Sequence, residues 1–326
     1  MLAHLSMRAL VWHGGRNLAM EELPEPEPAA GEVVLDVGLA GICGSDLHPF
    51  KGHHGPREPP LILGHEVVGT VDGLPGRWSV FPLVVCGSCE ACRAGRENLC
   101  PSRRLLGLHR PGVFADRVAV PRDALLEVPA GLSDEGAALV EPLAVCVGAL
   151  APARLGADSR VLVIGCGPIG LLSVQLAARH GAEVTAVEPV QARRDWASRL
   201  GAARTLAAAE GAEGLDADLT VDAVGAQATW RAAIAGTRPG GEVVIVGLAQ
   251  ADGAMPVADL VRRSIRLRGQ FAYTRAEFAE ALALLAAGGL PAGWLEVMPL
   301  TEGPAAFARL ADAPDATAKI LLRPGA

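Results

Sequence analysis

Aromatic residues are scarce in this sequence. Phenylalanine, tryptophan and tyrosine make up 4% of its 326 residues, whereas half of the residues are hydrophobic. The core must therefore be built mainly from alanine, valine and leucine, which are typical of buried parallel strands and closely packed helices. A chain of this length can bury two hydrophobic cores, so we expect two domains.

An excess of positive charge is also lacking. The formal net charge is −7 and the isoelectric point is near 5.7. Proteins that bind nucleic acids or anionic membranes usually present a basic surface, which this composition does not supply. We therefore expect neither nucleic acid nor membrane among the partners, and we expect a soluble enzyme that acts on a small molecule.

Signals for export and for membrane insertion are missing as well. Residues 1–20 lack the apolar segment and the small-residue cleavage site of a secretory signal, so we expect a cytoplasmic location. The uncharged run 161–178 is long enough to raise the question of a membrane span. Three glycines and a proline interrupt this run after a short β-branched stretch. That pattern indicates a strand, a tight turn and a helix instead.

Cysteine is present in an odd number, and four of the seven cysteines are clustered. Cys86, Cys89, Cys92 and Cys100 share a loop rich in Gly, Ser, Arg and Glu, which cannot bury four thiols. This arrangement argues against a secreted disulfide framework and is typical of a closed, tetrahedral zinc site with a structural role. An iron–sulfur cluster is the main alternative, and reduced structural cysteines are the other.

The hydrophobic pattern changes along the chain. Residues 7–130 contain short strands broken by glycine and proline, which predicts an irregular, mostly β domain, and the proline-rich segment 21–31 is expected to be a surface connection. From residue 160 strands and helices alternate, which predicts a parallel sheet with both faces covered. The expected strands are 161–164, 183–187, 219–223, 242–247 and 265–269, and the expected helices are 168–180, 191–200 and 227–235. The tail is expected to form a helix at 275–287 and strands at 295–299 and 319–322.

A glycine-rich turn follows the first of these strands. Gly165 permits the tight turn, Gly167 lets the backbone approach a pyrophosphate, and Gly170 lets helix and strand pack closely. Backbone N–H groups at the start of the helix would face the anion. Glu188 follows the next strand at the distance expected for a carboxylate that binds the ribose 2′-hydroxyl. The alternative is a glycine-rich structural turn.

The same carboxylate favours one dinucleotide over the other. Glu188 would repel a 2′-phosphate, so NAD is favoured over NADP. Arg193 and Arg194 weaken this preference, because either could bind a phosphate, stack on the adenine or lie in solvent.

A second set of metal-ligand types is dispersed through the N-terminal half. It consists of Cys43, the pair His65 and Glu66, and Glu141. Spacing alone does not unite these residues, since a single Cys, His or Glu is more often structural than metal-binding. His65 and Glu66 are neighbours that would face opposite sides of an ideal strand, so both can bind one ion only if the backbone bends there.

Nearly the whole chain resembles the zinc-containing medium-chain dehydrogenases. The resemblance is carried by these motifs: Cys43-Gly-Ser-Asp-Leu-His48, Gly64-His-Glu-Val-Val-Gly69, the four-cysteine loop, Glu141-Pro-Leu143, the glycine turn, Val221-Asp-Ala-Val-Gly225 and Pro239-Gly-Gly-Glu-Val243. It implies a Rossmann domain with a doubly wound parallel sheet, inserted in a mostly β, GroES-like catalytic domain. The implied boundaries are 1–147 for the catalytic domain, 148–271 for the Rossmann domain and 272–326 for the return to the catalytic domain.

The resemblance also implies the ligands of a catalytic zinc ion. Glu141 stands where simple alcohol dehydrogenases often have cysteine, as in the sorbitol and polyol dehydrogenase branch. In that branch the positions of Cys43, His65 and Glu66 carry the ligands, and Glu141 lies near the metal water. Whether Glu66 or Glu141 is the third protein ligand stays open at this point. One departure from the family is that residues 70–85 are short and lack the usual Gly-Asp-Arg-Val strand, which implies a trimmed hairpin.

The activity implied by the resemblance is hydride transfer between a secondary alcohol or polyol and NAD(H), with zinc as the Lewis acid. Ser45 and His48 would relay the proton and Glu66 would take part in catalysis; His48 could also be a plain surface histidine. Cofactor contacts are expected from Gly165, Gly167, Pro168, Ile169, Gly170, Glu188, Arg193, Val224 and Gly247.

The family also implies a homo-oligomer, either a tetramer or a dimer. Two other functions remain as alternatives to the zinc-dependent dehydrogenase. One is a zinc-independent quinone or enone reductase of the same fold, and the other is a non-catalytic NAD-binding protein. The particular alcohol or polyol is not specified by the sequence.

Overall fold

The computed structural model describes residues 6–52, 55–288, 290–291, 293–313 and 317–325. It consists of two compact units. The first unit contains Met1–Glu141 and Thr274–Ala326, and the second contains Pro142–Tyr273. The sequence predicts these divisions after residues 147 and 271. Helix α4 (Val140–Leu150) begins in the first unit and continues in the second.

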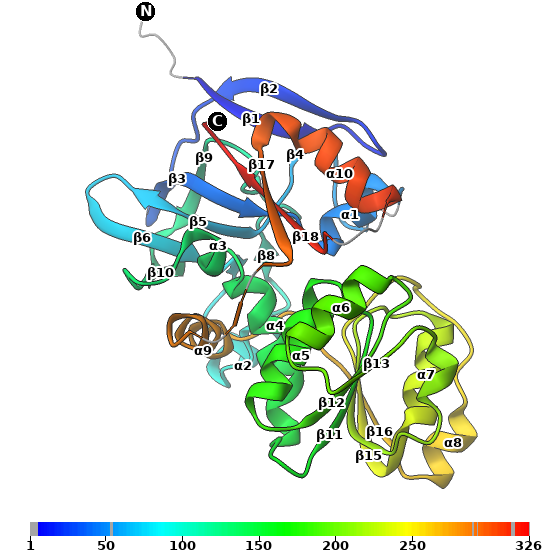
Figure 1. Cartoon of the computed structure of the whole chain (residues 1–326). Coiled ribbons are helices and arrows are strands. Elements are labelled where there is room, and N and C mark those ends of the chain that lie inside the picture. The colour runs from blue at the N-terminus through cyan, green and yellow to red at the C-terminus, as the bar shows by residue number, and fades with distance from the viewer. Residues whose placement is uncertain (1–5, 53–54, 289, 292, 314–316, 326) are drawn as a thin grey trace, which may run out of the picture. The chain divides into compact units, whose positions relative to one another are not determined.

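The first unit is mostly β (Figure 1). Its largest sheet has the order β10 (Leu125–Val128), β6 (Leu74–Val80), β5 (Glu66–Val71), β3 (Glu32–Gly41), β18 (Lys319–Arg323) and β17 (Leu295–Pro299), and β9 (Arg117–Pro121) also pairs with β3. A second sheet contains β2 (Leu18–Pro24), β1 (Ser6–Trp12) and β4 (Leu61–Ile62), and a third contains β7 (Leu83–Val84) and β8 (Arg104–Leu105). The last strand, β18, therefore pairs with β3 near the start of the chain.

Short helices complete this unit. They are α1 (Gly44–Phe50), α2 (Glu90–Arg93), α3 (Asp134–Ala137), α9 (Arg275–Ala286) and α10 (Gly303–Asp312). The few aromatic residues of the chain contribute to the core of this unit: the rings of Phe50 and Phe114 both contact Phe307, the ring of Phe81 contacts Phe278, and all five are buried. Another part of the core is aliphatic. Leu39, Val68 and Leu321 from three adjacent strands form this part with the two alanines of α3 and its C-cap.

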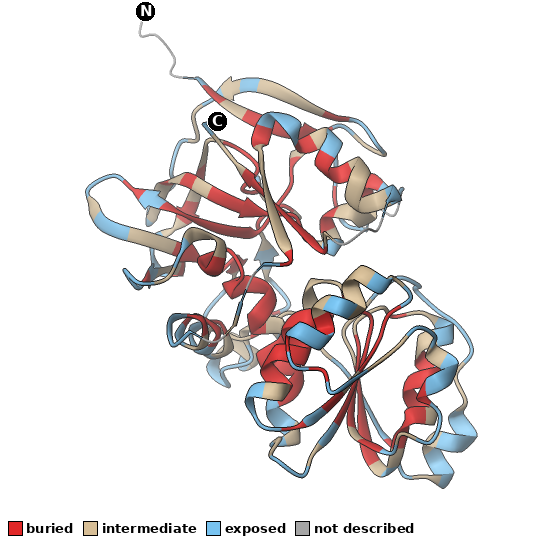
Figure 2. Cartoon of the chain, in the orientation of Figure 1, coloured by how far each residue is buried: buried red, intermediate tan, exposed pale blue. Residues whose placement is uncertain are grey.

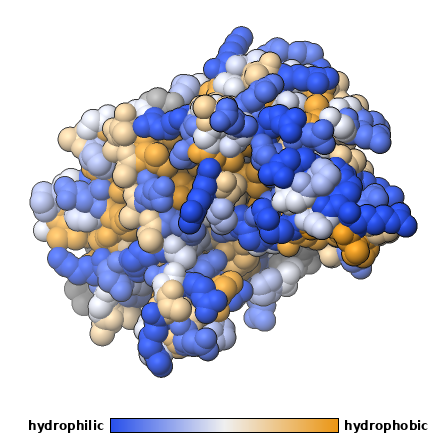
Figure 3. Space-filling view, turned by 90° about the horizontal axis from the view of Figure 1, so that it is seen from below, coloured by the Kyte–Doolittle hydropathy of each residue, from blue (hydrophilic) through white to orange (hydrophobic). Residues whose placement is uncertain are grey.

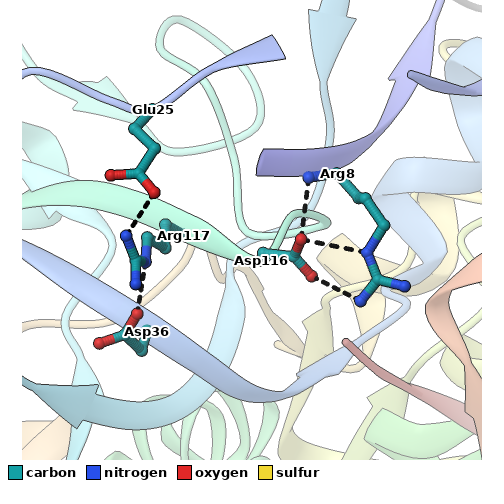
Figure 4. A network of polar contacts seen from close by, with 5 residues as sticks. All are labelled: Arg8, Glu25, Asp36, Asp116 and Arg117. Carbon is teal, nitrogen blue, oxygen red and sulfur yellow. Dashed lines mark hydrogen bonds and ion pairs between the residues drawn. The ribbon is translucent and has the colours of Figure 1, made fainter. Parts of the chain in front are cut away.

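Partly exposed ion pairs connect β1, β3 and the start of β9. Arg8 on β1 binds Asp116 through its backbone N–H and its guanidinium, and Arg117 on β9 binds both Glu25 and Asp36 (Figure 4). Exposed pairs of this kind contribute little free energy because solvent screens them. Their directional hydrogen bonds help to fix the register of β1, β9 and β3.

The second unit is a parallel, doubly wound sheet. Its strand order is β13 (Arg204–Leu206), β12 (Glu183–Val187), β11 (Arg160–Ile164), β14 (Ala217–Asp222), β15 (Thr237–Ile245) and β16 (Arg266–Gly269). Helices α5 (Pro168–Arg179) and α6 (Gln191–Arg199) cover one face, and α7 (Gln227–Gly236) and α8 (Val257–Arg262) lie on the other side (Figure 1). Figure 2 shows the central strands as a buried layer between helices with exposed outer faces. This is the Rossmann arrangement, so the expected fold class is confirmed.

One prediction about the first unit is wrong in part. Residues 21–24 belong to strand β2 rather than to a surface connection, because they pair with β1 in a regular antiparallel register. In the short segment that lacks the Gly-Asp-Arg-Val motif, β6 pairs with β5 in a hairpin that turns at Asp72-Gly73. Both strands are specified by their pairing partners, which local sequence does not reveal.

Among the described residues, no helix is both long enough and apolar enough to span a bilayer. The uncharged run 161–178 is divided between β11, a turn and α5, as expected. On the face seen in Figure 3, hydrophilic side chains surround smaller apolar areas.

Candidate functional site

The four clustered cysteines converge in a lobe of the first unit. Their sulfur atoms all lie within 4.8 Å of one another, with separations of 3.9 Å between Cys86 and Cys92 and 3.6 Å between Cys86 and Cys100. A tetrahedral zinc ion with Zn–S bonds of about 2.3 Å requires separations of about 3.8 Å. Disulfide bonds would require about 2.05 Å, and the seven cysteines form none. The donor set therefore fits zinc.

Two further features of this lobe fit a metal. Of residues 86–100 only Cys100 is buried, so the lobe has no hydrophobic core of its own. Hydrogen bonds from the backbone N–H groups of Ser88 and Cys89 lower the pKa of Cys86 to about 6. Burial and the neighbouring cysteines raise the pKa of Cys92, so the four sulfurs can carry negative charge together only beside a cation.

The dispersed ligand types also come together. One donor atom each from Cys43, His65 and Glu66 lies within 4.8 Å of the other two. Cys43 is the N-cap of α1, His65 lies in the loop after Gly64, and Glu66 is the first residue of β5. The fold thus assembles three ligands that sequence spacing could not unite.

The backbone bend that this arrangement needs is present. Gly64 has a φ of +93°, a left-handed conformation that favours glycine, and its missing side chain leaves room for the ring of Phe114. Strand β5 begins only at Glu66, so His65 lies outside the strand. The alternation of strand faces therefore does not separate these two neighbours.

Asp46 is a residue of this centre that the sequence did not predict, although it lies within the motif Cys43-Gly-Ser-Asp-Leu-His48. Its side chain is completely buried and accepts hydrogen bonds from the backbone N–H groups of Cys43 (3.0 Å) and Gly64 (3.3 Å). Its Oδ1 also lies 3.6 Å from Nδ1 of His65 and 3.8 Å from the guanidinium of Arg57. Asp46 thereby ties both ligand-bearing segments together. Its position as the third residue of a helix with a capping box is the signal that could have found it.

Charges around His65 affect its protonation in the absence of metal. Burial alone would lower the pKa of the imidazole, but the nearby charges of Asp46 and Cys43 outweigh burial and raise the pKa to about 10. The electrostatic environment therefore favours positive charge at this position, as a cation-binding site requires.

Lys319 was also missed by the sequence analysis. This residue of β18 is 1% exposed, and its ammonium group forms an ion pair with Oε2 of the fully buried Glu66. Burial would lower the pKa of Lys319, but Glu66 and Cys43 outweigh it and raise the pKa, so the side chain is charged. Among the described residues, Oε1 of Glu66 has no hydrogen-bond partner. A buried carboxylate oxygen without a partner is costly, and a metal ion bound there would satisfy it.

Glu141, Ser45 and His48 are the other residues predicted for this centre. Glu141, 8% exposed at the start of α4, is not one of the three donors grouped above, although its charge contributes to the raised pKa values of His65 and Lys319. Ser45 and His48 both lie on α1, directly after Cys43, and the backbone N–H of Ser45 donates to the Cys43 sulfur at 3.5 Å.

The glycine turn of the second unit has the geometry that its sequence predicts. Gly165 directly follows β11 and has a φ of +90°, and Gly167 is the N-cap of α5, which Pro168 begins. A methyl group at Gly170 would lie 1.7 Å from the carbonyl oxygen of Gly165, whereas one at Gly167 would meet nothing within 4 Å. The turn therefore leaves open space at the helix N-terminus, where a pyrophosphate would bind.

Glu188 stabilises this turn. It is 5% exposed, and its carboxylate accepts hydrogen bonds from the backbone N–H groups of Cys166 (2.8 Å) and Val190 (3.0 Å). Arg194 folds back and donates to the carbonyl oxygen of Glu188. Arg193 lies in the first turn of α6. These contacts place the carboxylate beside the glycine turn, where the ribose contact was predicted.

Val224 and Gly247 lie at the same edge of the sheet. They follow β14 and β15, and a methyl group on Gly247 would lie 2.1 Å from the backbone carbon of Val224. A methyl group on Gly165 would lie 2.6 Å from the side chain of Val224. The carboxyl ends of β11, β14 and β15 thus meet where the strand order reverses, which is where dinucleotides bind in such sheets.

Comparisons with known proteins agree with this architecture. Residues 29–130 match the family described as alcohol dehydrogenase GroES-like domain, and residues 168–287 match the family described as zinc-binding dehydrogenase. A sorbitol dehydrogenase of Bacillus subtilis is 35% identical over 309 residues, which is 87% of each chain. A 2-dehydro-3-deoxy-L-galactonate 5-dehydrogenase of Pseudoalteromonas atlantica is 33% identical over 93% of this chain and 95% of its own length.

Solved structures show the same fold over the full length. A protein described as a zinc-binding dehydrogenase from Sinorhizobium meliloti, bound to NADP, has a TM-score of 0.89 and 32% identity, and covers 98% of this chain and all of its own. The acetophenone reductase of Geotrichum candidum, in complex with NAD, has a TM-score of 0.90 and 28% identity, and covers 98% of this chain and 97% of its own. The chain belongs to the zinc-type medium-chain alcohol and polyol dehydrogenases.

Proposed function

We propose that this alcohol or polyol dehydrogenase is zinc-dependent, uses NAD(H), and interconverts a secondary alcohol group with its ketone. The observation that carries the proposal is the convergence of Cys43, His65 and Glu66, with one buried oxygen of Glu66 lacking a partner. The four-cysteine lobe supplies a second zinc site that has no open position and serves the structure.

A zinc ion would act as a Lewis acid on the substrate oxygen, and NAD would accept the hydride. The chain's own residues hold these groups and move the proton. Cys43, His65 and Glu66 would hold the ion, and Asp46 fixes the segments that carry the first two. Ser45 and His48 on α1 transfer the hydroxyl proton toward solvent, since histidine has an ordinary pKa near working pH.

Glu66, rather than Glu141, is proposed as the third protein ligand. Glu66 belongs to the group of donors within 4.8 Å of one another and has an oxygen without a partner. Glu141 lies close enough to contribute charge and would then contact the water or substrate beside the ion.

NAD is proposed as the preferred cofactor. The buried carboxylate of Glu188 beside the glycine turn can accept a hydrogen bond from the ribose 2′-hydroxyl and would repel a 2′-phosphate. Relatives solved with NAD and with NADP both occur, so similarity alone does not decide the preference. The test is the ratio of kcat/KM for the two cofactors, which should favour NAD in the native enzyme and move toward NADP in Glu188→Ala.

The proposed substrates are polyols and sugar acids with a secondary hydroxyl group, by analogy with relatives named for sorbitol and galactonate derivatives. The experiment combines metal analysis with a screen of NAD reduction over sugar alcohols, sugar acids and simple secondary alcohols. We expect two zinc atoms per chain, and one zinc with loss of activity in Cys43→Ser. A protein without zinc that reduces quinones with NADPH would refute the proposal and favour the zinc-independent reductase.

Three further expectations from the sequence are kept as proposals. The catalytic domain is proposed to comprise both chain ends around the cofactor-binding domain, and the location is proposed to be cytoplasmic.

The protein is proposed to form a homo-oligomer through the edge strand β16, because Val257, Val261 and Leu267 are large apolar side chains left exposed on β16 and the neighbouring α8.

A further inference from the structure

Lysine is used very sparingly in this chain. Of its 29 basic residues two are lysine, Lys51 and Lys319, and the other 27 are arginine. Lys51 is exposed at the end of α1, whereas Lys319 is 1% exposed. A chain that uses arginine almost everywhere has therefore placed a lysine at its most buried cationic position. An ammonium group is more compact than a guanidinium group, so tight space is the physical reason to choose it.

The space around Lys319 is set by a glycine on the strand between the two charges. Strands β5, β3 and β18 are neighbours, with Glu66 opposite Gly41 and Gly41 opposite Leu321. Lys319 lies two residues from Leu321 and faces the same side of the sheet. A methyl group on Gly41 would lie 2.0 Å from Oε2 of Glu66 and 3.0 Å from Cε of Lys319. The ion pair reaches across the middle strand only because Gly41 has no side chain.

We propose that Lys319 is a positioning residue for the metal-binding carboxylate of Glu66. Its ammonium group holds Oε2, which leaves Oε1 for an ion shared with Cys43 and His65. The inference rests on the proposed function, because it requires a metal ion at this centre. Groups that bind and orient a ligating side chain in this way are as important to a metal site as the ligands themselves.

Two effects of Lys319 on the metal have opposite signs. Its positive charge repels a divalent cation, while its ion pair with Glu66 orients a ligand for that cation. The repulsion is weakened because the ammonium charge is already in contact with a carboxylate, so the pair is close to neutral as seen from the ion. Without Lys319, Oε2 of Glu66 would lose the ion pair that holds it, so the side chain would no longer be fixed with Oε1 directed toward Cys43 and His65. Positioning therefore outweighs repulsion, and loss of Lys319 should weaken metal binding.

Cobalt(II) is the probe for the test, because its visible absorption reports the ligand set. The variants are Lys319→Met, which removes the charge, and Gly41→Ala, which keeps both charges but occupies the space that the carboxylate needs. The contact made by the new methyl group is with the movable end of the Glu66 side chain, so the strand can accommodate alanine. Lys51→Met is the matched control at the other, exposed lysine. The four-cysteine site serves as an internal reference in every variant.

We expect cobalt at the Cys43 centre to bind roughly 10–100-fold more weakly in both Lys319→Met and Gly41→Ala, with altered absorption bands. Lys51→Met should match the native protein, and the four-cysteine site should be unchanged throughout. Equal or tighter binding in Lys319→Met, or native affinity and spectrum in Gly41→Ala, would overturn the inference. If Lys319→Met does not fold, Gly41→Ala decides the matter alone. If the native protein binds metal only at the four cysteines, it is the proposed function that fails.

Discussion

At Gly170 and Gly167 the same substitution should have two different effects. A methyl group at Gly170 would lie 1.7 Å from the backbone oxygen of Gly165, so Gly170→Ala should lower the free energy of unfolding by about 1–3 kcal/mol. A methyl group at Gly167 meets no protein atom within 4 Å, and the φ of −72° suits alanine. Gly167→Ala should therefore leave stability unchanged but obstruct the pyrophosphate, weakening NADH binding by roughly 5- to 150-fold, which corresponds to about 1–3 kcal/mol.

Denaturant unfolding and titration of NADH fluorescence measure these two effects separately. Each variant serves as the control for the other, since they carry the same added methyl group three residues apart. Unimpaired NADH binding by Gly167→Ala would contradict the placement of the pyrophosphate at this turn.

Cys166 should make stability depend on pH in the alkaline range. Burial and the charge of Glu188 raise the pKa of its thiol from 9.0 to about 12. As the pH rises the unfolded chain ionises this thiol first, so the contribution of Cys166 to stability is complete below about pH 9 and is lost progressively toward pH 12. Cys166→Ala should therefore lose less stability than the native protein between pH 8 and pH 11. Melting temperatures of the two proteins measured across that range test this, and parallel curves would show that the thiol is not protected.

Residues of the two candidate metal centres differ in how far sequence alone could predict them. Cys86, Cys89, Cys92 and Cys100 lie within one loop, so local spacing was sufficient. The dispersed centre is assembled from a helix cap, a loop and a strand, and only its resemblance to a family united the ligands. Lys319 was not predictable, because its pairing with Glu66 depends on which strand lies beside β3.

At the scale of elements, the parallel sheet was the part that sequence predicted best. Strand β12 has the predicted bounds, Glu183–Val187, and β11 and β14 begin one or two residues before theirs. Strands buried on both faces form continuous apolar runs bounded by turn residues, which is a strong local signal. Strand β2 carries charged residues along a sheet edge, and helix α10 begins with Gly303-Pro304, so neither gave such a signal.

The four-cysteine lobe should depend on metal for its structure. Its short helix α2 and the adjacent turn contain no buried residue, and only Cys100 is buried between residues 86 and 100. Apparent binding free energies of structural zinc are about 10–16 kcal/mol in small peptides. A loop without a hydrophobic core cannot gain a comparable folding free energy from its own contacts. Cys92→Ser should therefore reduce the zinc content by one atom per chain and expose residues 86–100 to proteolysis.

Metal analysis together with limited proteolysis tests this prediction. The control is Cys146→Ser, because Cys146 is buried in α4 outside both metal centres. Native zinc content and native protease resistance in Cys92→Ser would show that the lobe does not need its fourth sulfur.

At the scale of the whole molecule, the edge strand β16 is the feature that bears on how two copies would associate. Within the described residues β16 pairs only with β15, so its outer backbone groups are available to another strand. Val257 and Val261, one helical turn apart on α8, are 60% and 73% exposed, and Leu267 on β16 is 41% exposed. Two copies related by a twofold axis could pair their β16 strands and bury these side chains together.

Val261→Asp should therefore shift the protein toward the monomer in analytical ultracentrifugation, because a carboxylate would be buried without a partner at the contact. Leu99→Asp is the matched control, since Leu99 is 51% exposed but lies in the first unit near the four cysteines. If the native protein is oligomeric and Val261→Asp keeps the same mass, the copies must associate through another surface. A shift caused by Leu99→Asp alone would place that surface on the four-cysteine lobe instead of on the edge of the parallel sheet.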